Sequence, residues 1–390
     1  MSNSATPTGK ASGPLTGLRV VELSGMGPGP FAAMLLADMG AEVIQVDRPA
    51  ESELALAPKF DAMRRSRRSV ILDLRRPEGV EAALELIEKA DVLIEGYRPG
   101  VAERLGLGAE ECLRRNPRLV YGRMTGWGQD GPWFMMAGHD ICYTALTGAL
   151  HAIGREGERP AVPVNLLGDF AGGSLYLVVG LLAAVHEASR SGQGQVVDAA
   201  IVDGAASLTT MLHGMMAAGA WRDERGVNLL DTGVPWYDVY ATSDGGHMAV
   251  GALEAKFYAE FVRLLEIEDG LELREDPSRW PELRKRFEEA FAHRTRAEWE
   301  QVFAGSDACV APVLSMTEAG EHEHLAARAT FVDVDGMRQP APAPRFSRTG
   351  AAIQGPPCEP GEHTREVLLN WGVADVDALL ESGAAVQTPS

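Results

Sequence analysis

The chain has 390 residues, of which 45% are hydrophobic and 23% charged, and its formal net charge is −19. The length predicts two domains, and the composition is typical of a soluble globular protein. The negative charge argues against nucleic acid and against anionic membrane surfaces as main partners.

The cysteines form no CxxC pair and have no regular spacing: Cys112, Cys142, Cys309 and Cys358. This usage predicts a reducing compartment and no structural zinc. Residues 1–14 lack an apolar stretch, which predicts a disordered tail rather than a signal peptide. The most apolar segment, 175–185, is about half as long as a membrane span and predicts a buried helix. We therefore expect a cytoplasmic protein without a membrane partner.

Strands and helices alternate in the first half of the chain. Strands are expected at 18–23, 41–46, 69–74, 91–94, 119–124 and 195–201, and helices at 31–39, 77–89 and 101–115. Such an alternation predicts an α/β fold with a parallel sheet built from βαβ units. Asp169 is expected in a loop that leads into the buried helix.

The sequence changes character near Pro235. A long helix at 203–221 precedes a predicted hairpin at 237–253, followed by helices at 255–265, 281–291 and 297–303. These elements predict a smaller α+β domain. The expected boundaries are a large domain at 15–203, a linker helix at 204–235, a small domain at 236–330 and a C-terminal segment at 331–390 that returns to the large domain. The proline-rich stretch 339–344 is interpreted as a linker.

The first predicted turn, Gly25–Pro30, resembles a dinucleotide-binding turn, and Asp47 ends the next strand, where a ribose-binding carboxylate would lie. However, the fingerprint requires Gly or Ala at the position of Pro30. Pro28 and Pro30 also lack the N–H groups that would hold a pyrophosphate. A tight turn is therefore favoured over a nicotinamide cofactor site.

Basic residues gather between positions 59 and 76, where seven Lys and Arg face two Asp. They form either a solvated surface or a phosphate-binding one. Arg48, Arg98 and Arg104 follow predicted strand ends, where open α/β sheets bind ligands. Each alone would be a surface ion pair, but with Arg75 they favour a ligand carrying several phosphates.

His139 and Asp169 are the candidate catalytic residues, and each follows a glycine that allows a ligand to approach the backbone. An imidazole and a carboxylate together suit proton transfer at carbon. The alternatives are an ordinary loop histidine and an aspartate that caps the following helix, a role compatible with catalysis. The run His322-Glu323-His324 is interpreted as helix surface rather than a metal site.

Six segments resemble the class III CoA-transferase (CaiB/BaiF) superfamily and, within it, the α-methylacyl-CoA racemases. They are GLRVVEL at 17–23, DMGAEV at 38–43, DVLIEGYRPG at 91–100, MTGWGQ at 124–129, GHD at 138–140 and NLLGD at 165–169. The GHD segment distinguishes the racemases, because the transferases usually carry an aromatic residue where His139 stands.

The resemblance implies a Rossmann-like large domain and a smaller domain in an interlocked homodimer. It implies the catalytic residues His139 and Asp169, with Glu254 supplied by the small domain of the other chain. The substrate is expected to be an acyl-CoA thioester, with no metal and no separate cofactor. The residues implied to contact CoA are Arg48, Leu72, Asp73, Leu74, Arg75, Gly96, Tyr97, Arg98, Arg104, Gly138, Asp140, Ile141, Cys142 and Tyr143.

The expected activity is that of an isomerase in lipid and fatty acid metabolism. It interconverts (2R)- and (2S)-2-methylacyl-CoA by two-base proton transfer through an enolate. One alternative is a CoA-transferase in which Asp169 is the nucleophile and His139 is not needed; another is a non-catalytic CoA-thioester-binding protein. Core packing is the favoured role of Met211, Met215 and Met216, and an acyl-chain surface is the alternative.

Overall fold

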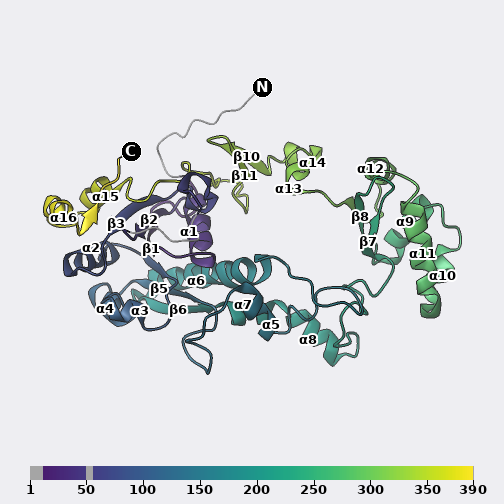
Figure 1. Ribbon diagram of the computed structural model, residues 1–390, viewed down its shortest axis with the longest axis horizontal. Helices are drawn as coiled ribbons and strands as arrows, with labels where there is room; N and C mark the ends of the chain where they lie inside the picture. Colours follow the sequence, from purple (N-terminus) through teal and green to yellow (C-terminus); the bar gives the residue numbers. More distant parts are fainter. Residues whose placement is uncertain (1–11, 50–55, 390) are drawn as a thin grey trace. The chain divides into compact units, whose positions relative to one another are not determined.

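The computed structural model describes residues 12–49 and 56–389 (Figure 1). The chain forms two compact units: unit 1 comprises Met1–Thr147, Val164–Leu208 and His324–Ser390, and unit 2 comprises Gly148–Pro163 and Thr209–Glu323. Residues 148–163 thus belong with unit 2, although the sequence placed all of 15–203 in the large domain. Most of the predicted tail at 1–14 lies outside the described residues.

Within the described residues, unit 1 contains a sheet of seven strands in the order β12-β3-β2-β1-β4-β5-β6. Their bounds are β1 Arg19–Leu23, β2 Glu42–Asp47, β3 Arg68–Leu72, β4 Val92–Glu95, β5 Val120–Thr125, β6 Gln195–Ala200 and β12 Ala385–Val386. The first six are parallel, which confirms the predicted fold class, and β12 pairs antiparallel with β3. The strand order reverses at β1, so a crevice is expected between the carboxyl ends of β1 and β4.

Helices cover both faces of this sheet (Figure 1). Val21 and Leu23 face a core shared with α2, α4, α15 and α16, whereas Val20 faces a core shared with α1 and α6. This alternation follows from the two-residue period of a strand. The helices of unit 1 are α1 Pro28–Asp38, α2 Pro77–Glu88, α3 Val101–Arg104, α4 Ala109–Arg115, α5 Asp140–Leu146, the π-helix η3 Leu166–Leu175, α6 Tyr176–Ser191, α7 Ile201–Leu208, α15 Thr364–Asn370 and α16 Val376–Ser382, with short 3₁₀ turns η1 Pro58–Phe60 and η2 Ala62–Arg64.

Two predicted helices are each broken in the structure. The helix expected at 101–115 is divided into α3 and α4, because Gly106 has a φ of +77° and a Cβ on Gly108 would lie 2.8 Å from Glu103. The helix expected at 203–221 is α7 followed by α8, Thr210–Ala217. Conversely, α1 begins earlier than expected, at Pro28, because the fixed φ of proline suits the first helical position.

The segment interpreted as a linker, 339–344, begins inside a hairpin. Strand β11, Met337–Pro340, pairs antiparallel with β10, Phe331–Val334. Gln339 is buried, and its Oε1 accepts from Nη1 of Arg65 at 2.7 Å. Proline was a misleading signal here because the next ladder hydrogen bond comes from the Ala341 amide, which donates to the Thr330 carbonyl at 2.9 Å, so the missing N–H of Pro340 costs the hairpin nothing.

Unit 2 has its own aromatic core. The predicted hairpin is present as β7 Tyr237–Ala241 and β8 His247–Gly251, and β9 Val310–Pro312 adds a third strand. Tyr240, Phe261 and Phe287 are among the residues that fill the core beneath this sheet. The helices of this part are α8, α9 Ala255–Leu264, α10 Gly270–Glu275, η4 Pro277–Arg279, α11 Trp280–Phe291, α12 Arg296–Phe303 and α13 Met316–Ala319, followed by α14 Glu323–Ala327 at the boundary with unit 1.

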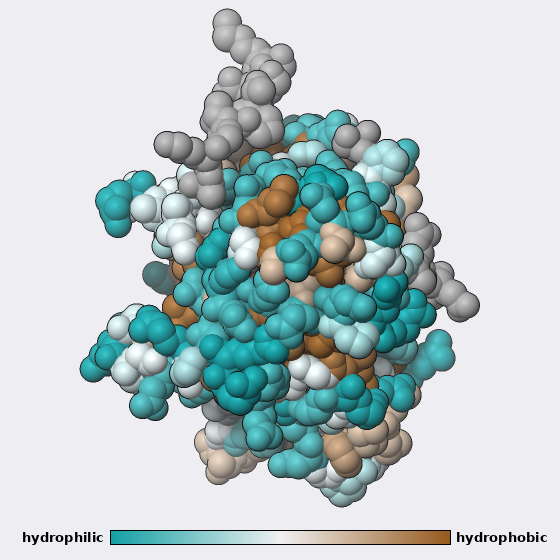
Figure 2. Space-filling view, turned by 90° about the vertical axis from the view of Figure 1, so that its left-hand side faces the viewer, coloured by the Kyte–Doolittle hydropathy of each residue, from teal (hydrophilic) through white to brown (hydrophobic). Residues whose placement is uncertain are grey.

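Hydrophilic residues dominate the face on the side of α2, α15 and α16, with smaller hydrophobic patches between them (Figure 2). Around η3 and α6 the surface is more apolar, since Leu175 and Val179 are 48% and 67% exposed. The helix expected to be buried is therefore buried on one side only. Together η3 and α6 give a helix, 166–191, that by length and composition could cross a membrane, a property that core helices of soluble proteins share.

Candidate active site

A cavity of about 470 Å³ lies at the carboxyl ends of four neighbouring strands, β1, β4, β5 and β6. This is the crevice that the strand reversal at β1 creates. Its walls are the turn Gly25–Gly27 after β1 with the first residues of α1, the loop Gly96–Pro99 after β4 and the segment Met124–Trp127 at the end of β5. His139 and Asp169 both line it, so the structure brings the two candidate catalytic residues to one cavity.

His139 directly precedes α5 and is exposed. Its backbone is extended, with φ −134° and ψ 173°, and its side chain makes no capping hydrogen bond, so the imidazole is not used to cap the helix. Gly138 lies against aromatic rings: a Cβ there would stand 2.8 Å from Tyr143 and 3.0 Å from Trp127. The Tyr143 hydroxyl also donates to the Gly138 carbonyl. These contacts fix the backbone that carries His139.

Asp169 lies near the beginning of the π-helix η3, whose N-cap is Asn165. The prediction of a helix-capping loop residue is therefore wrong, because the helix begins earlier than the apolar run indicates. A Cβ on Gly27 would stand 3.3 Å from Oδ2 of Asp169, so the carboxylate lies beside the first βα turn. π-Helical segments are rare in proteins and are frequently found at functional sites.

Burial raises the pKa of Asp169 above its ordinary value, and the nearby carboxylate of Asp140 acts in the same direction. The Asn165 amide, which donates to Oδ2 of Asp169 at 3.4 Å, and the charge of His139 oppose this rise. A carboxyl group with a raised pKa is better suited to exchanging a proton with carbon than an ordinary surface aspartate.

Asp140 connects the two candidate residues. It is buried, and its Oδ2 accepts the backbone N–H of Asp169 at 2.7 Å. Gly168 leaves the space for this bond, because a Cβ there would stand 2.4 Å from the same oxygen. Ser174 holds the other side of the π-helix by donating to the carbonyls of Asp169 and Pro28.

The residues implied to contact CoA fall into two groups. Gly96, Tyr97, Arg98, Gly138 and Tyr143 line the cavity. The others do not line it: Arg48, Leu72, Asp73, Leu74, Arg75, Arg104, Asp140, Ile141 and Cys142. Of these, Arg48 is exposed and lies over the Tyr97 ring, 5.3 Å from its centroid. Arg75 is exposed and paired with Asp73 at 2.9 Å.

Three of the seven basic residues at 59–76 are not available to bind phosphate. Arg64 and Arg65 are buried in ion pairs with Asp47 and Asp38, at 2.7 and 2.6 Å, and Arg67 is buried against Glu22. Buried charges require partners of opposite sign, so these arginines are committed to the fold.

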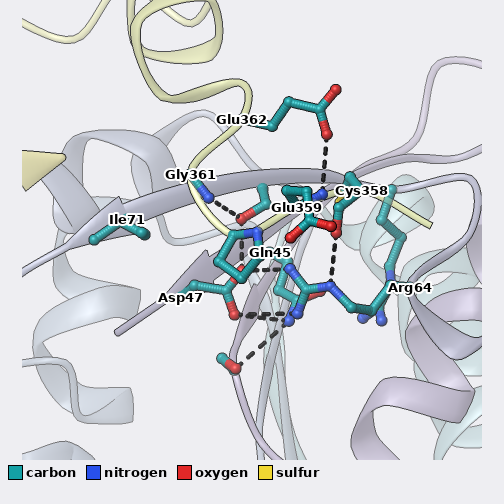
Figure 3. Close-up of polar contacts among 12 residues, drawn as sticks. Gln45, Asp47, Arg64, Ile71, Cys358, Glu359, Gly361 and Glu362 are labelled. Atoms are coloured by element: carbon teal, nitrogen blue, oxygen red, sulfur yellow. Dashed lines mark hydrogen bonds and ion pairs between the residues drawn. The ribbon is translucent and has the colours of Figure 1, made fainter. Parts of the chain in front are cut away.

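Asp47 is fully occupied in the same network (Figure 3). It accepts from Arg64, from Gln45 at 2.9 Å and from Ser69 at 2.5 Å. Nε of Arg64 also donates to the carbonyl of Cys358 at 2.9 Å, which holds the C-terminal segment on the sheet. Asp47 is therefore not available to bind a ribose.

Three other predictions concern residues in unit 2. Glu254 precedes α9 and is exposed, and its side chain makes no capping hydrogen bond. The favoured prediction was that Met211, Met215 and Met216 pack in the core. This prediction is wrong, because no residue of α8 is buried. The His322 ring lies 2.9 Å from Oε1 of Glu300 rather than in a metal cluster, and the described residues contain no such cluster.

Sequence reasoning missed several residues of the cavity. Gly27 and Asn165 were inside recognised segments, but only the fold shows that both lie beside Asp169. Phe134 and Met136 line the cavity as well. Their signal was available as a run of four large apolar residues directly before the His139 segment.

Comparison with known proteins agrees with the geometry. A family model described as CoA-transferase family III matches residues 15–364. The "Alpha-methylacyl-CoA racemase" of Mus musculus is 46% identical over 94% of this chain and 95% of its own, and that of Homo sapiens 45% over 92% and 93%. A solved structure of a CAIB/BAIF family protein from Brucella suis matches with a TM-score of 0.79 at 25% identity, covering 92% of this chain and all of that one.

Proposed function

Because this chain belongs to CoA-transferase family III, we propose that it is an isomerase that interconverts (2R)- and (2S)-2-methylacyl-CoA thioesters. The observation that carries this proposal is that His139 and Asp169 line one cavity, beside residues implied to contact CoA. The 45–46% identity to proteins named as racemases supports it further.

In the proposed reaction, one of the two side chains removes the α-proton and the other returns a proton to the opposite face. The thioester oxygen becomes an enolate and needs hydrogen-bond donors. The Asp169 amide is already used by Asp140. The proposed donor is the Asp140 amide, because Asp140 directly follows His139 and is the first residue of α5, where an N–H group has no acceptor within the helix.

The raised pKa of Asp169 brings its acidity closer to that of an imidazole. The free-energy cost of returning a proton from either residue is then lower than it would be for two groups with widely different pKa values. No metal, redox group or separate cofactor is required for this step, and we propose that none takes part.

The competing transferase mechanism makes a different demand on the same cavity. There, Asp169 attacks the thioester and His139 has no part. The test incubates one epimer of a 2-methylacyl-CoA in D₂O without an acceptor acid. Epimerisation with α-deuterium uptake, abolished in His139→Ala, is the expected result. In a second incubation a carboxylic acid is added as acceptor. Transfer of CoA to this acid without α-exchange would instead support the transferase.

We also propose a homodimer in which Glu254 of one chain serves the His139 of the other. The exposed apolar side chains of Val179 and Leu208 in unit 1 support the proposal, because such side chains are typical of surfaces that are covered in an assembly. Co-expressing a His139→Ala chain with a Glu254→Gln chain tests the arrangement. Shared sites leave one intact site in each mixed dimer, so activity is expected to return; if Glu254 served its own chain, every site would stay defective.

A further inference from the structure

Glu95 is a buried carboxylic acid beside the candidate active site that the proposed proton transfer does not use. It ends β4 and is only 4% exposed. Ile94 lines the cavity and Glu95 does not, because successive side chains of a strand point to opposite faces of the sheet. Burying a carboxyl group is unfavourable unless it is hydrogen-bonded or paired with a charge, so its partners indicate what it does.

The carboxyl group of Glu95 holds the chain that follows it. Its Oε2 accepts the backbone N–H of Tyr97 at 2.7 Å. Gly96, Tyr97 and Arg98 line the cavity and are among the residues implied to contact CoA; they are called the Gly96–Arg98 wall below. The Tyr97 ring in turn carries the Arg48 guanidinium, 5.3 Å from its centroid. One hydrogen bond to Glu95 therefore fixes the backbone of this wall, although Glu95 itself does not reach the cavity.

Arg123 faces the other oxygen of Glu95. The two residues are register partners on the parallel strands β4 and β5, and Nε of Arg123 lies 3.9 Å from Oε1 of Glu95. This Nε is buried and makes no hydrogen bond within the part of the chain that the structure describes. The guanidinium is anchored elsewhere, since it donates to Glu103 of α3 and, at 3.2 Å, to Oε1 of Gln129. Arg123 is thus held by two neighbours with its Nε–H available to Glu95.

Glu95 changes its charge near neutral pH. Burial raises the pKa of Glu95 to about 7, and the negative charges of Glu103 and Asp198 act in the same direction. The hydrogen bond from the Tyr97 amide and the charge of Arg123 oppose this rise. A hydrogen bond to an ionised acceptor is stronger than one to a neutral acceptor. The bond that fixes the wall is therefore stronger above this pH than below it.

Other ionisable groups lie around Glu95. The hydroxyls of Tyr97 and Tyr121 interact with its charge, and burial raises the pKa of both, so they stay neutral near pH 7. On β1, the other neighbour of β4, Glu22 is buried against Arg67, and burial raises the pKa of Glu22 as well. A pH effect has to be assigned to Glu95 by substituting Glu95 itself.

We propose that Glu95 is a positioning residue for substrate binding: its ionised carboxylate holds the Gly96–Arg98 wall in the conformation that binds the CoA part of the substrate, and Arg123 keeps the carboxylate aligned. The inference rests on the proposed function and adds a residue that acts through the wall rather than by touching the substrate. Protonation of Glu95 weakens the bond from the Tyr97 amide, so the affinity for CoA falls as the pH falls through about 7.

The experiment measures the dissociation constant of free CoA by calorimetry, between about pH 5.5 and 8.5, for the unmodified protein and for Glu95→Gln. The carboxamide keeps an oxygen for the Tyr97 amide but carries no charge at any pH. Because a phosphate monoester itself titrates near pH 6, the quantity compared is the ratio of the two constants at each pH. Glu95→Gln should bind CoA about fivefold more weakly at the alkaline end and equally well at the acidic end.

Two further variants separate the hydrogen bond from the charge. Glu95→Ala lacks the acceptor and should bind CoA about tenfold more weakly at the alkaline end, and it should stay weaker than Glu95→Gln at the acidic end. Glu103→Gln is the matched control, because it makes the same change on the other carboxylate that contacts Arg123 and leaves the Tyr97 bond intact. Its CoA affinity should stay within about twofold of that of the unmodified protein.

Kinetics distinguish positioning from chemistry. In α-deuterium exchange of 2-methyldecanoyl-CoA, Glu95→Gln should raise KM at alkaline pH and leave kcat nearly unchanged, because Glu95 does not touch the reacting atoms. A ratio of CoA dissociation constants that does not vary with pH would overturn the proposal and leave Glu95 a role in folding alone.

Tighter CoA binding by Glu95→Gln at alkaline pH would also overturn it, because the carboxylate would then act by repelling the CoA phosphates. An equal loss of affinity in Glu103→Gln would assign the effect to Arg123 and overturn it too. Absence of α-exchange in the unmodified protein would overturn the racemase function, while the CoA dissociation constants would still decide the role of Glu95.

Discussion

The carboxylate of Asp140 accepts the backbone N–H of Asp169 at 2.7 Å and so joins two segments that lie 29 residues apart in sequence. Asp140 directly follows His139, and Asp169 is the other residue proposed to move a proton. The spacing of the two side chains around the cavity therefore depends on one buried hydrogen bond as well as on helix packing.

Replacing Asp140 by Ala should leave the Asp169 amide without its acceptor. We expect the free energy of unfolding to fall by about 1–3 kcal/mol. The rate of α-exchange should fall by about 100-fold, because a shift of about 1 Å in a catalytic group has this effect. Thermal unfolding and exchange kinetics measure the two effects. The exposed Asp130→Ala serves as control, and equal behaviour of the two variants would contradict the proposed link.

Asp169→Asn should catalyse α-exchange much more slowly yet be more stable at neutral pH. Burial raises the pKa of Asp169, so the folded state holds a proton that the unfolded state releases as pH rises above 3.8. The ionised group therefore destabilises the fold increasingly as pH rises through that window, and Asn removes this effect. Urea midpoints at pH 4 and pH 7 should show the gain mainly at pH 7. Exchange should fall by about 10²–10⁴-fold.

Asp73→Asn is the control of opposite sign. Hydrogen bonds from Arg75 lower the pKa of Asp73, so its charge favours the folded state above the unfolded pKa. This substitution should reduce stability slightly at pH 7, and the effect should be small because the pair is exposed. A stabilising Asp73→Asn would contradict the electrostatic explanation for Asp169.

Gly126→Ala should damage the wall of the cavity behind His139. A Cβ there would stand 2.0 Å from Cζ of Tyr143, so the ring that fixes Gly138 has to move. Overpacking of this kind costs about 1–3 kcal/mol of stability. Gly214→Ala is the matched control, because its Cβ would enter open space within α8. It should be neutral or stabilise by up to about 1 kcal/mol. Unfolding midpoints compare the two.

The arginines of the basic run should separate into structural and ligand-binding residues. Arg64→Met leaves Asp47 buried without its partner and should destabilise the fold by about 3–5 kcal/mol. Arg75→Met removes an exposed pair and should change stability by at most about 1 kcal/mol. If Arg75 contacts CoA, its substitution should instead raise KM. A stable Arg64→Met protein with a raised KM would contradict the assignment of Arg64 to the fold.

Several parts of this architecture could be predicted from local sequence. Apolar runs such as 18–23 and 91–94 mark strands that are buried on both faces of the sheet, and Pro77 marks a helix start. These signals depend on neighbours along the chain. The break between α3 and α4 was not predicted, because one glycine inside an apolar helical pattern is compatible with either outcome until Gly106 takes a positive φ.

The sequence by itself determined the βαβ order of the large unit, the family segments and the identity of His139 and Asp169 as candidates. Only the tertiary structure decided that both line one cavity, that Asp140 joins them, and that Arg64 and Arg67 are buried in ion pairs rather than exposed to phosphates. The physical reason is that a residue type and its neighbours fix local backbone preference. Burial and charge pairing depend on segments that meet only when the sheet forms.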